Sequence, residues 1–304
     1  MNNETTRGHL LTEQINSAST NLDQLSPLEI VDLFNQEDQK TINAIALARQ
    51  EIAQTITITA ESLRKGGRLF YVGAGTSGRL GVLDAAECPP TFCTPPDMVQ
   101  GILAGGEGAM FKSSEALEDR AEDGARAIVD HQITDNDIVI GITAGGTTPY
   151  VHGALAEAKK RKAKTAFISC VPQEQFKIDV DVDVDIRLLT GAEILSGSTR
   201  LKAGTVTKMA LNIISTGVMV QLGKVYGNRM IDVSVTNSKL LDRALRIITD
   251  LTDLDREKAR ELLSSSESKV KLALLMQGKN ITKTEAQTLL NQNQGNLRQA
   301  LIDN

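Results

Sequence analysis

Five short apolar runs follow one another between residues 68 and 189 of the 304-residue chain. Helical patterns at roughly 114–131 and 149–162 separate some of these runs, so strands and helices alternate. Parallel strands need crossover connections of about this length, usually a helix. The sequence therefore predicts an α/β protein with a doubly wound, five-stranded parallel sheet flanked by helices. We expect the strands near residues 68–73, 99–104, 137–142, 165–170 and 184–189.

Helical patterns also lie on both sides of the predicted sheet in the sequence. A short helix is expected at 27–35, and a longer one from about 39 to 65. After Asn237, leucine and alanine recur at helical spacing to the end of the chain. We therefore expect three segments: an N-terminal helical segment at 1–57, the sheet-containing domain at 58–236, and a small C-terminal helical module at 237–304.

The charge balance excludes several classes of partner. The chain has 33 basic and 38 acidic residues, a net charge of −5, and no basic stripe. Nucleic acid and anionic membranes are therefore not expected as partners. The N-terminus lacks the apolar region of a signal peptide, and no apolar run approaches bilayer length, so we expect a cytoplasmic protein.

The cysteines point to the same compartment. Cys88, Cys93 and Cys170 have no metal-binding spacing, and three thiols cannot all pair within one chain. We expect reduced thiols, with no disulfide and no zinc site.

A glycine turn follows the first predicted strand. The run Leu69-Phe70-Tyr71-Val72 leads into Gly73-Ala74-Gly75-Thr76-Ser77-Gly78, whose glycines allow a tight turn that exposes N–H groups at a helix start. This turn also matches the dinucleotide fingerprint G-x-G-x-x-G. Pro89-Pro90 is expected to end the next helix early, so that it runs only from Arg79 to about Cys88. A dinucleotide unit usually has a full crossover helix after this turn, so the short helix argues against a dinucleotide site. Thr76 and Ser77 suit a phosphate monoester, while a capped turn without a ligand remains an alternative.

A second loop repeats this design. The predicted strand at 137–142 is followed by Thr143-Ala144-Gly145-Gly146-Thr147-Thr148-Pro149, and Pro149 suits the first position of a helix. In an open parallel sheet, both loops lie at the carboxyl ends of their strands, where such folds bind ligands.

Two further stretches carry charged residues. In residues 191–205, Ser198 or Thr199 can cap a helix from about 201 to 222, while Arg200 and Lys202 fall in its first turn. Cations are disfavoured there, which suggests a nearby anion, although two solvated side chains remain an alternative. The alternating aspartates at 179–185 could bind a metal, but an exposed or edge strand is the preferred interpretation.

The stretches Gly73–Gly78, Arg79–Phe92 and Glu193–Thr205 resemble the N-acetylmuramic acid 6-phosphate etherases. These are sugar isomerase (SIS) domain proteins related to the glucokinase regulatory protein. The resemblance runs over nearly the whole chain and implies an SIS-type sheet with a ubiquitin-associated-like C-terminal module. It also implies cleavage of the lactyl ether of N-acetylmuramic acid 6-phosphate, without a metal or other cofactor, by a homodimer with its site at or near the subunit interface.

The resemblance also implies the site residues. The two catalytic glutamates of the family correspond to Glu87, as general acid, and Glu118, as general base. Glu87 is expected at a helix end, partly buried and protonated, and Glu118 near the start of a helix that opens at Ser113-Ser114, ionised. The substrate and phosphate contacts are expected from Gly75, Thr76, Ser77, Gly78, Thr143, Gly145, Gly146, Thr147, Thr148, Glu193, Ser198 and Lys202.

Two other functions use the same kind of loops. An SIS aldose–ketose isomerase would move protons between C1 and C2 of a sugar phosphate without releasing an acid. A sugar-phosphate sensor would bind without turnover, but no DNA-binding helix-turn-helix is evident in the sequence. His9, His131 and His152 have no motif partners and are assigned no chemistry.

Overall fold

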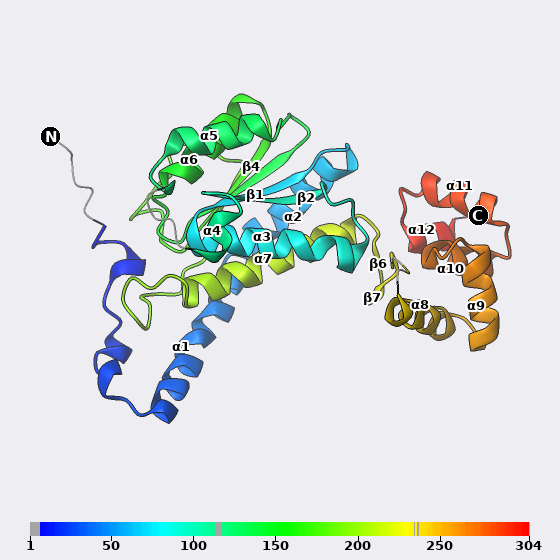
Figure 1. Ribbon diagram of the computed structural model, residues 1–304, viewed down its shortest axis with the longest axis horizontal. Helices are drawn as coiled ribbons and strands as arrows, with labels where there is room; N and C mark the ends of the chain where they lie inside the picture. The colour runs from blue at the N-terminus through cyan, green and yellow to red at the C-terminus, as the bar shows by residue number, and fades with distance from the viewer. Residues whose placement is uncertain (1–6, 113–116, 234, 236, 304) are drawn as a thin grey trace. The chain divides into compact units, whose positions relative to one another are not determined.

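The computed structural model describes residues 7–112, 117–233, 235 and 237–303. A five-stranded sheet forms its centre, with all neighbouring strands parallel and the order β2-β1-β3-β4-β5 (Figure 1). This order confirms the predicted doubly wound sheet. The strands are β1 (Leu69–Gly73), β2 (Val99–Leu103), β3 (Ile138–Ile142), β4 (Lys164–Ser169) and β5 (Val184–Arg187).

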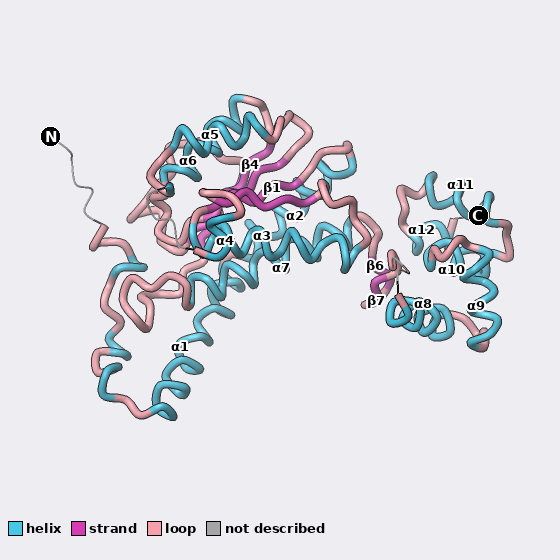
Figure 2. Tube along the Cα trace, in the orientation of Figure 1, coloured by secondary structure: helices cyan, strands magenta, loops and turns pink. Residues whose placement is uncertain are grey.

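Helices cover both faces of the sheet (Figure 2). One face packs against α5 (Ala121–Asp130) and α6 (Pro149–Lys160), and the buried cluster between them includes Phe70, Val139 and Leu155. The helices of the other face are α2 (Arg49–Arg64), α3 (Gly75–Phe92) and α7 (Lys202–Gln221).

A polar network fixes α3 and α7 to the sheet. The Asp84 carboxylate of α3 accepts hydrogen bonds from the Tyr71 hydroxyl of β1 at 2.9 Å and from Asn212 of α7 at 2.7 Å. Because Asp84 is buried, this pairing satisfies a charge that would otherwise be costly inside the protein.

The described chain divides into two compact units, Met1–Ala86 with Asp97–Ser215, and Glu87–Pro96 with Thr216–Asn304. The second unit has its own apolar cluster, which includes Leu245, Leu275 and Leu290, as expected for a C-terminal helical module. The finer boundaries at 57 and 236, and the ubiquitin-associated-like identity of the module, stay predictions. Its elements are β6 (Val225–Tyr226), β7 (Arg229–Met230), α8 (Ser238–Leu251), α9 (Arg256–Ser265), α10 (Val270–Lys279), α11 (Lys283–Gln292) and α12 (Leu297–Ile302).

The N-terminal helices differ from the prediction in where they break. Ser26 and Glu29 form a capping box at the start of α1 (Pro27–Leu47), which continues through the expected gap near residue 36. The break falls instead at Ala48, between α1 and α2. Three short 3-10 helices precede α1, at Leu11–Glu13, Ser17–Ser19 and Leu22–Gln24.

Two other helices correct the sequence analysis. Pro89 and Pro90 lie inside α3, which ends at Phe92 and not at Cys88. Proline removes one backbone donor but keeps a helical φ, and the Cys93 N–H still donates to the Pro89 carbonyl at 2.9 Å. We expected no apolar run of bilayer length, but α7 has the length and mean hydropathy of a membrane span. Half of its most apolar 18-residue stretch, 50%, is buried inside the structure, and core helices pass the same test.

The aspartate-rich stretch forms the sheet edge, but only part of it is a strand. β5 begins at Val184, and Asp183 just before it accepts hydrogen bonds from the Thr165 N–H and hydroxyl, at 2.8 and 3.0 Å. Asp185 pairs with Arg187 at 2.7 Å. These two aspartates therefore stabilise the edge of the sheet.

Candidate functional site

The two predicted loops emerge side by side. β1 and β3 are neighbours in the sheet, and their last residues, Gly73 and Ile142, are paired in register. The order of the strands reverses at this pair, since β2 lies beyond β1 and β4 lies beyond β3. Open α/β sheets bind ligands at the carboxyl ends of the strands at such a switch point.

A cavity of about 240 Å³ opens at this point. Both loops, the turn that carries Glu118 and the N-terminal residues Arg7 and Glu13 contribute to its wall. Predicted site residues in this wall are Gly75, Thr76, Ser77, Glu118, Thr143, Gly145, Thr147 and Thr148; the others are Arg7, Leu10, Glu13, Ala74, Ala144 and Thr199.

The first loop presents backbone donors to the cavity. Gly75 has a φ of +53°, which favours glycine, and α3 begins at this residue. The N–H groups in the first turn of a helix have no acceptor within the helix, and the helix dipole adds positive potential there. Gly78 serves close packing, because a Cβ atom there would lie 2.4 Å from the Gly73 carbonyl oxygen.

The second loop is held by side chains at its two ends. The Thr143 and Thr148 hydroxyl oxygens lie 2.7 Å apart, and Pro149 begins α6, as predicted. Nε2 of His152 lies 2.6 Å from the Gly146 carbonyl oxygen, so an Nε2–H tautomer donates to it. Burial lowers the pKa of His152, although this hydrogen bond opposes the shift. The sequence analysis gave His152 no role, but the side chain positions this loop.

Glu118 lies in a turn, and not within a helix. α5 begins at Ala121, later than the expected helix, and Ser113 and Ser114 lie outside the described residues. The Glu118 carbonyl accepts a hydrogen bond from the Tyr150 N–H of α6 at 3.0 Å. Close approach of α5 and α6 supports this contact, since a Cβ atom at Gly124 would lie 1.9 Å from the Tyr150 carbonyl oxygen.

Glu87 lies further along α3, in the second unit. Its side chain is exposed, so the partial burial that we expected is not seen in the single chain. The helix also continues for five residues beyond it, to Phe92, so Glu87 does not end the helix.

Glu193 and Lys202 are buried at the start of α7. The Glu193 carboxylate accepts from the Lys202 and Ala203 N–H groups, both at 2.9 Å. It therefore caps α7, in place of the expected Ser198 or Thr199. Burial raises the pKa of Glu193, although these two hydrogen bonds oppose the shift.

We expected an anion near Lys202, and in the structure this anion is a carboxylate of the protein itself. Lys202 Nζ lies 2.6 Å from a carboxylate oxygen of Glu37 in α1, and the Lys202 side chain is 0% exposed. Neither Lys202 nor Glu193 lines the cavity, and the same is true of Gly78, Gly146 and Ser198. A role for these five residues in substrate contact stays a prediction.

Residues 7–19, here called the N-terminal strap, form part of the cavity wall. Asn16 donates to Glu37 at 2.7 Å and to the Ala192 carbonyl at 3.1 Å. The Leu11 N–H donates to the Gln175 side chain at 2.7 Å. These contacts hold Arg7, Leu10 and Glu13 at the cavity, which the sequence analysis missed. No local signal reveals these three residues, because Gln175 and Ala192 are more than 160 residues from their partners in the strap.

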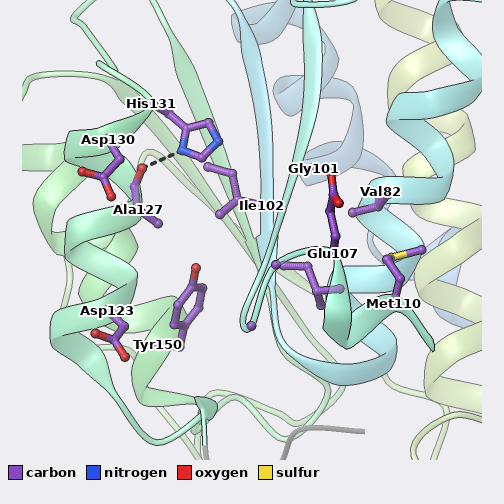
Figure 3. Close-up of a pocket in the computed structure, with 13 residues that line it drawn as sticks. Val82, Gly101, Ile102, Glu107, Met110, Asp123, Ala127, Asp130, His131 and Tyr150 are labelled. Carbon is purple, nitrogen blue, oxygen red and sulfur yellow. Dashed lines mark hydrogen bonds between the residues drawn. The ribbon is translucent and has the colours of Figure 1, made fainter. Parts of the chain in front are cut away.

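A larger cavity of about 530 Å³ lies along the edge strand β2 (Figure 3). Its wall includes Glu107, Asp123 and Asp130, while Nδ1 of His131 lies 2.8 Å from the Ala127 carbonyl oxygen. The described residues of this wall include no lysine or arginine to offset the carboxylates. The smaller cavity at the switch point combines Arg7 with the hydroxyls and backbone donors of two loops, so it is the better candidate site for a phosphorylated ligand.

Potential metal ligands and thiols were also located in the described residues. Within 7–112, 117–233, 235 and 237–303, no three His, Cys, Asp or Glu residues form a group that could hold a metal ion. Cys88, Cys93 and Cys170 form no disulfide in the described part of the chain. Burial raises the pKa of Cys170 to about 12, so that thiol stays protonated.

Known proteins resemble the whole chain. Residues 51–159 match the glucokinase regulatory protein N-terminal SIS domain, and residues 227–284 match the C-terminal lid domain of glucokinase regulatory protein. A protein of Picosynechococcus sp. named N-acetylmuramic acid 6-phosphate etherase is 70% identical over 99% of both chains. One of the same name from Trichodesmium erythraeum is 68% identical over 99% of this chain and 97% of its own. Among solved structures, a phosphoheptose isomerase from Neisseria gonorrhoeae is 14% identical, with a TM-score of 0.46 over 63% of this chain and 97% of its own.

Proposed function

The chain belongs to the N-acetylmuramic acid 6-phosphate etherase family, and we propose that it cleaves the D-lactyl ether of that sugar phosphate in the recycling of cell-wall sugars. The products are N-acetylglucosamine 6-phosphate and D-lactate, so the enzyme is a carbon–oxygen lyase. The observation that carries the proposal is the cavity at the switch point, which joins both glycine loops and Glu118 in one wall.

The phosphate is proposed to bind at the first turn of α3. Backbone N–H groups after Gly75 and the hydroxyls of Thr76 and Ser77 supply donors, and the helix dipole favours the negative charge. The hydroxyls of Thr147 and Thr148, from the second loop, line the same cavity.

Two carboxyl groups suffice for the proposed chemistry. In the open-chain sugar, the Glu118 carboxylate removes the C2 proton, which is acidic because C1 is an aldehyde. Glu87 then protonates the ether oxygen as the C3–O bond breaks, so lactate leaves with that oxygen. Water adds to C3 of the resulting double bond and a proton returns to C2, which gives the second product.

We further propose a cytoplasmic homodimer with the site at or near the subunit interface. Large apolar side chains on α1 support a contact with a second copy: Leu28, Val31, Ile42 and Leu47 are 60–77% exposed. Exposed apolar side chains gathered on one element are typical of association surfaces.

Isotope labelling tests the reaction. The purified protein, without added metal or nucleotide, is incubated with N-acetylmuramic acid 6-phosphate in H₂¹⁸O, and both products are analysed by mass spectrometry. Unlabelled lactate is expected together with ¹⁸O on C3 of the sugar, located by fragmentation, because the C1 aldehyde oxygen also exchanges with water. Label in the lactate would instead indicate attack on the lactyl carbon. Saturable binding without lactate release would exclude the etherase function in favour of an isomerase or a sensor.

A further inference from the structure

The substrate of the proposed reaction carries two anionic groups, and the two glycine loops account for only one. The phosphate on C6 meets the donors of the first loop, whereas the lactyl carboxylate on C3 needs a separate partner. Glu13 and Glu118 also line the cavity, so an uncompensated third carboxylate there would be repelled. The lactyl group therefore requires a nearby cation.

Arg7 alone carries a positive charge among the described residues that line the cavity. On the basis of the function proposed above, we propose that the Arg7 guanidinium binds the lactyl carboxylate and so selects ether substrates over N-acetylglucosamine 6-phosphate. A guanidinium presents a planar pair of donors that matches a carboxylate, and it adds a full positive charge that the neutral hydroxyls and backbone N–H groups of the loops lack.

The position of Arg7 fits the chemistry of the substrate. One guanidinium nitrogen of Arg7 lies 3.7 Å from the Asp119 carboxylate, and Asp119 directly follows Glu118. Glu118 is the proposed base for C2, and the lactyl ether is attached to the adjacent carbon, C3. A cation beside the Glu118 turn is therefore where the lactyl carboxylate would lie when the base reaches C2.

The strap holds the Arg7 backbone while leaving its side chain accessible. The Leu10 N–H donates to the Arg7 carbonyl at 2.9 Å, and the Leu10 side chain is buried. By contrast, the Arg7 and Asp119 side chains are 48% and 64% exposed, and an ion pair of 3.7 Å between exposed groups is weak. A ligand carboxylate bound in the cavity can therefore compete for this guanidinium.

The competing explanation is that Arg7 only tethers the strap to the Glu118 turn. In that case Asp119 is the functional partner, and its removal has the same consequence as removal of Arg7. The chain thus offers a matched pair of variants, Arg7→Gln and Asp119→Asn, which break the same ion pair from opposite sides.

The test compares these two variants and Arg7→Lys with the wild type. Lactate release gives kcat/KM for N-acetylmuramic acid 6-phosphate, and inhibition by N-acetylglucosamine 6-phosphate reports binding without a lactyl group. For Arg7→Gln we expect kcat/KM to fall about 10- to 100-fold, with the inhibition constant changed less than about 2-fold. Asp119→Asn should keep kcat/KM within about 2-fold of wild type, and Arg7→Lys should regain part of the loss.

Equal losses in Arg7→Gln and Asp119→Asn would overturn the proposal in favour of a tether. An inhibition constant that rises together with KM would overturn it as well, because Arg7 would then serve the phosphate or the sugar. Unchanged kinetics for Arg7→Gln, with lactate released by the wild type, would reject the role of Arg7 and leave the proposed function intact. Absence of lactate with the wild type would instead reject the proposed function itself.

Discussion

Lys202 Nζ and a Glu37 carboxylate oxygen lie 2.6 Å apart, although the two residues are separated by 165 positions in the chain. The side chains are 0% and 5% exposed, so the ion pair is inside the protein. Asn16 of the strap donates to the same Glu37 oxygen. The pair therefore joins three parts of the first unit: α1, the start of α7 and the strap that reaches the cavity.

The first prediction concerns the stability contributed by this pair. Glu37→Gln leaves the Lys202 ammonium buried without the carboxylate that it contacts, and such losses cost about 3–5 kcal/mol of unfolding free energy. Replacing both residues by apolar ones of similar size, Glu37→Leu with Lys202→Met, removes both charges and should cost much less. Denaturant unfolding of the wild type and the two variants measures the difference. A double variant as unstable as Glu37→Gln would contradict this account.

Acid should selectively remove the contribution of Glu37 to the free energy of unfolding. Burial acts to raise the pKa of Glu37, but the hydrogen bonds from Lys202, Lys40 and Asn16 outweigh burial and lower the pKa to about 2. The unfolded value is near 4.5, so the unfolded state takes up the proton first as pH falls. The contribution is complete above pH 4.5 and is lost between about pH 4.5 and 2.

Unfolding free energies at pH 6 and pH 3 test this dependence. The difference in unfolding free energy between wild type and Glu37→Gln should be smaller at pH 3 than at pH 6, because the Gln variant lacks the titrating group. Glu122→Gln, at an exposed position in the first turn of α5, is the control for general acid effects. A gap that stays constant between the two pH values would show that ionised Glu37 does not stabilise the fold.

The first loop should not tolerate a methyl group at Gly78. A Cβ atom there would lie 2.4 Å from the Gly73 carbonyl oxygen and 2.5 Å from a Leu103 methyl carbon. We expect Gly78→Ala to move the start of α3, to raise KM more than 10-fold and to lower the unfolding free energy by about 1–3 kcal/mol. Gly108→Ala is the matched control, since no atom lies within 4 Å of a Cβ at Gly108. Similar kinetics for both variants would contradict the packing argument.

Glu118→Gln tests the proposed base. The amide keeps the size of the side chain but cannot accept the C2 proton, so kcat should fall about 10²- to 10⁴-fold while KM changes little. Exchange of the C2 hydrogen with D₂O, followed by mass spectrometry of the sugar, should slow by the same factor. Glu122→Gln, four residues further along the chain, should leave both rates unchanged. If exchange continued while lactate release stopped, another group would be the base.

The sequence revealed the sheet and both loops because their signals are local. Buried parallel strands are continuous apolar runs, and a turn such as Gly73 to Gly78 requires glycine at fixed positions. The strap was missed because Arg7 and Glu13 are ordinary polar residues, and Asn16 finds its partner Ala192 only in the folded chain. Glu193 was assigned to substrate, since nothing local indicates that an acid nine residues before Lys202 would cap the helix.

Glu87→Gln tests the proposed acid and the proposed dimer together. The Glu87 side chain is exposed in the single chain, so a site that shields it needs a further surface, and the proposed partner subunit supplies one. The variant should lose lactate release and still bind N-acetylmuramic acid 6-phosphate, as calorimetry can measure.

If each site takes Glu87 from one subunit and Glu118 from the other, coexpressed Glu87→Gln and Glu118→Gln chains form mixed dimers with one intact site. We expect lactate release to return in that mixture, although each variant alone is inactive. No recovery in a verified mixed dimer would mean that both glutamates of a site come from one chain.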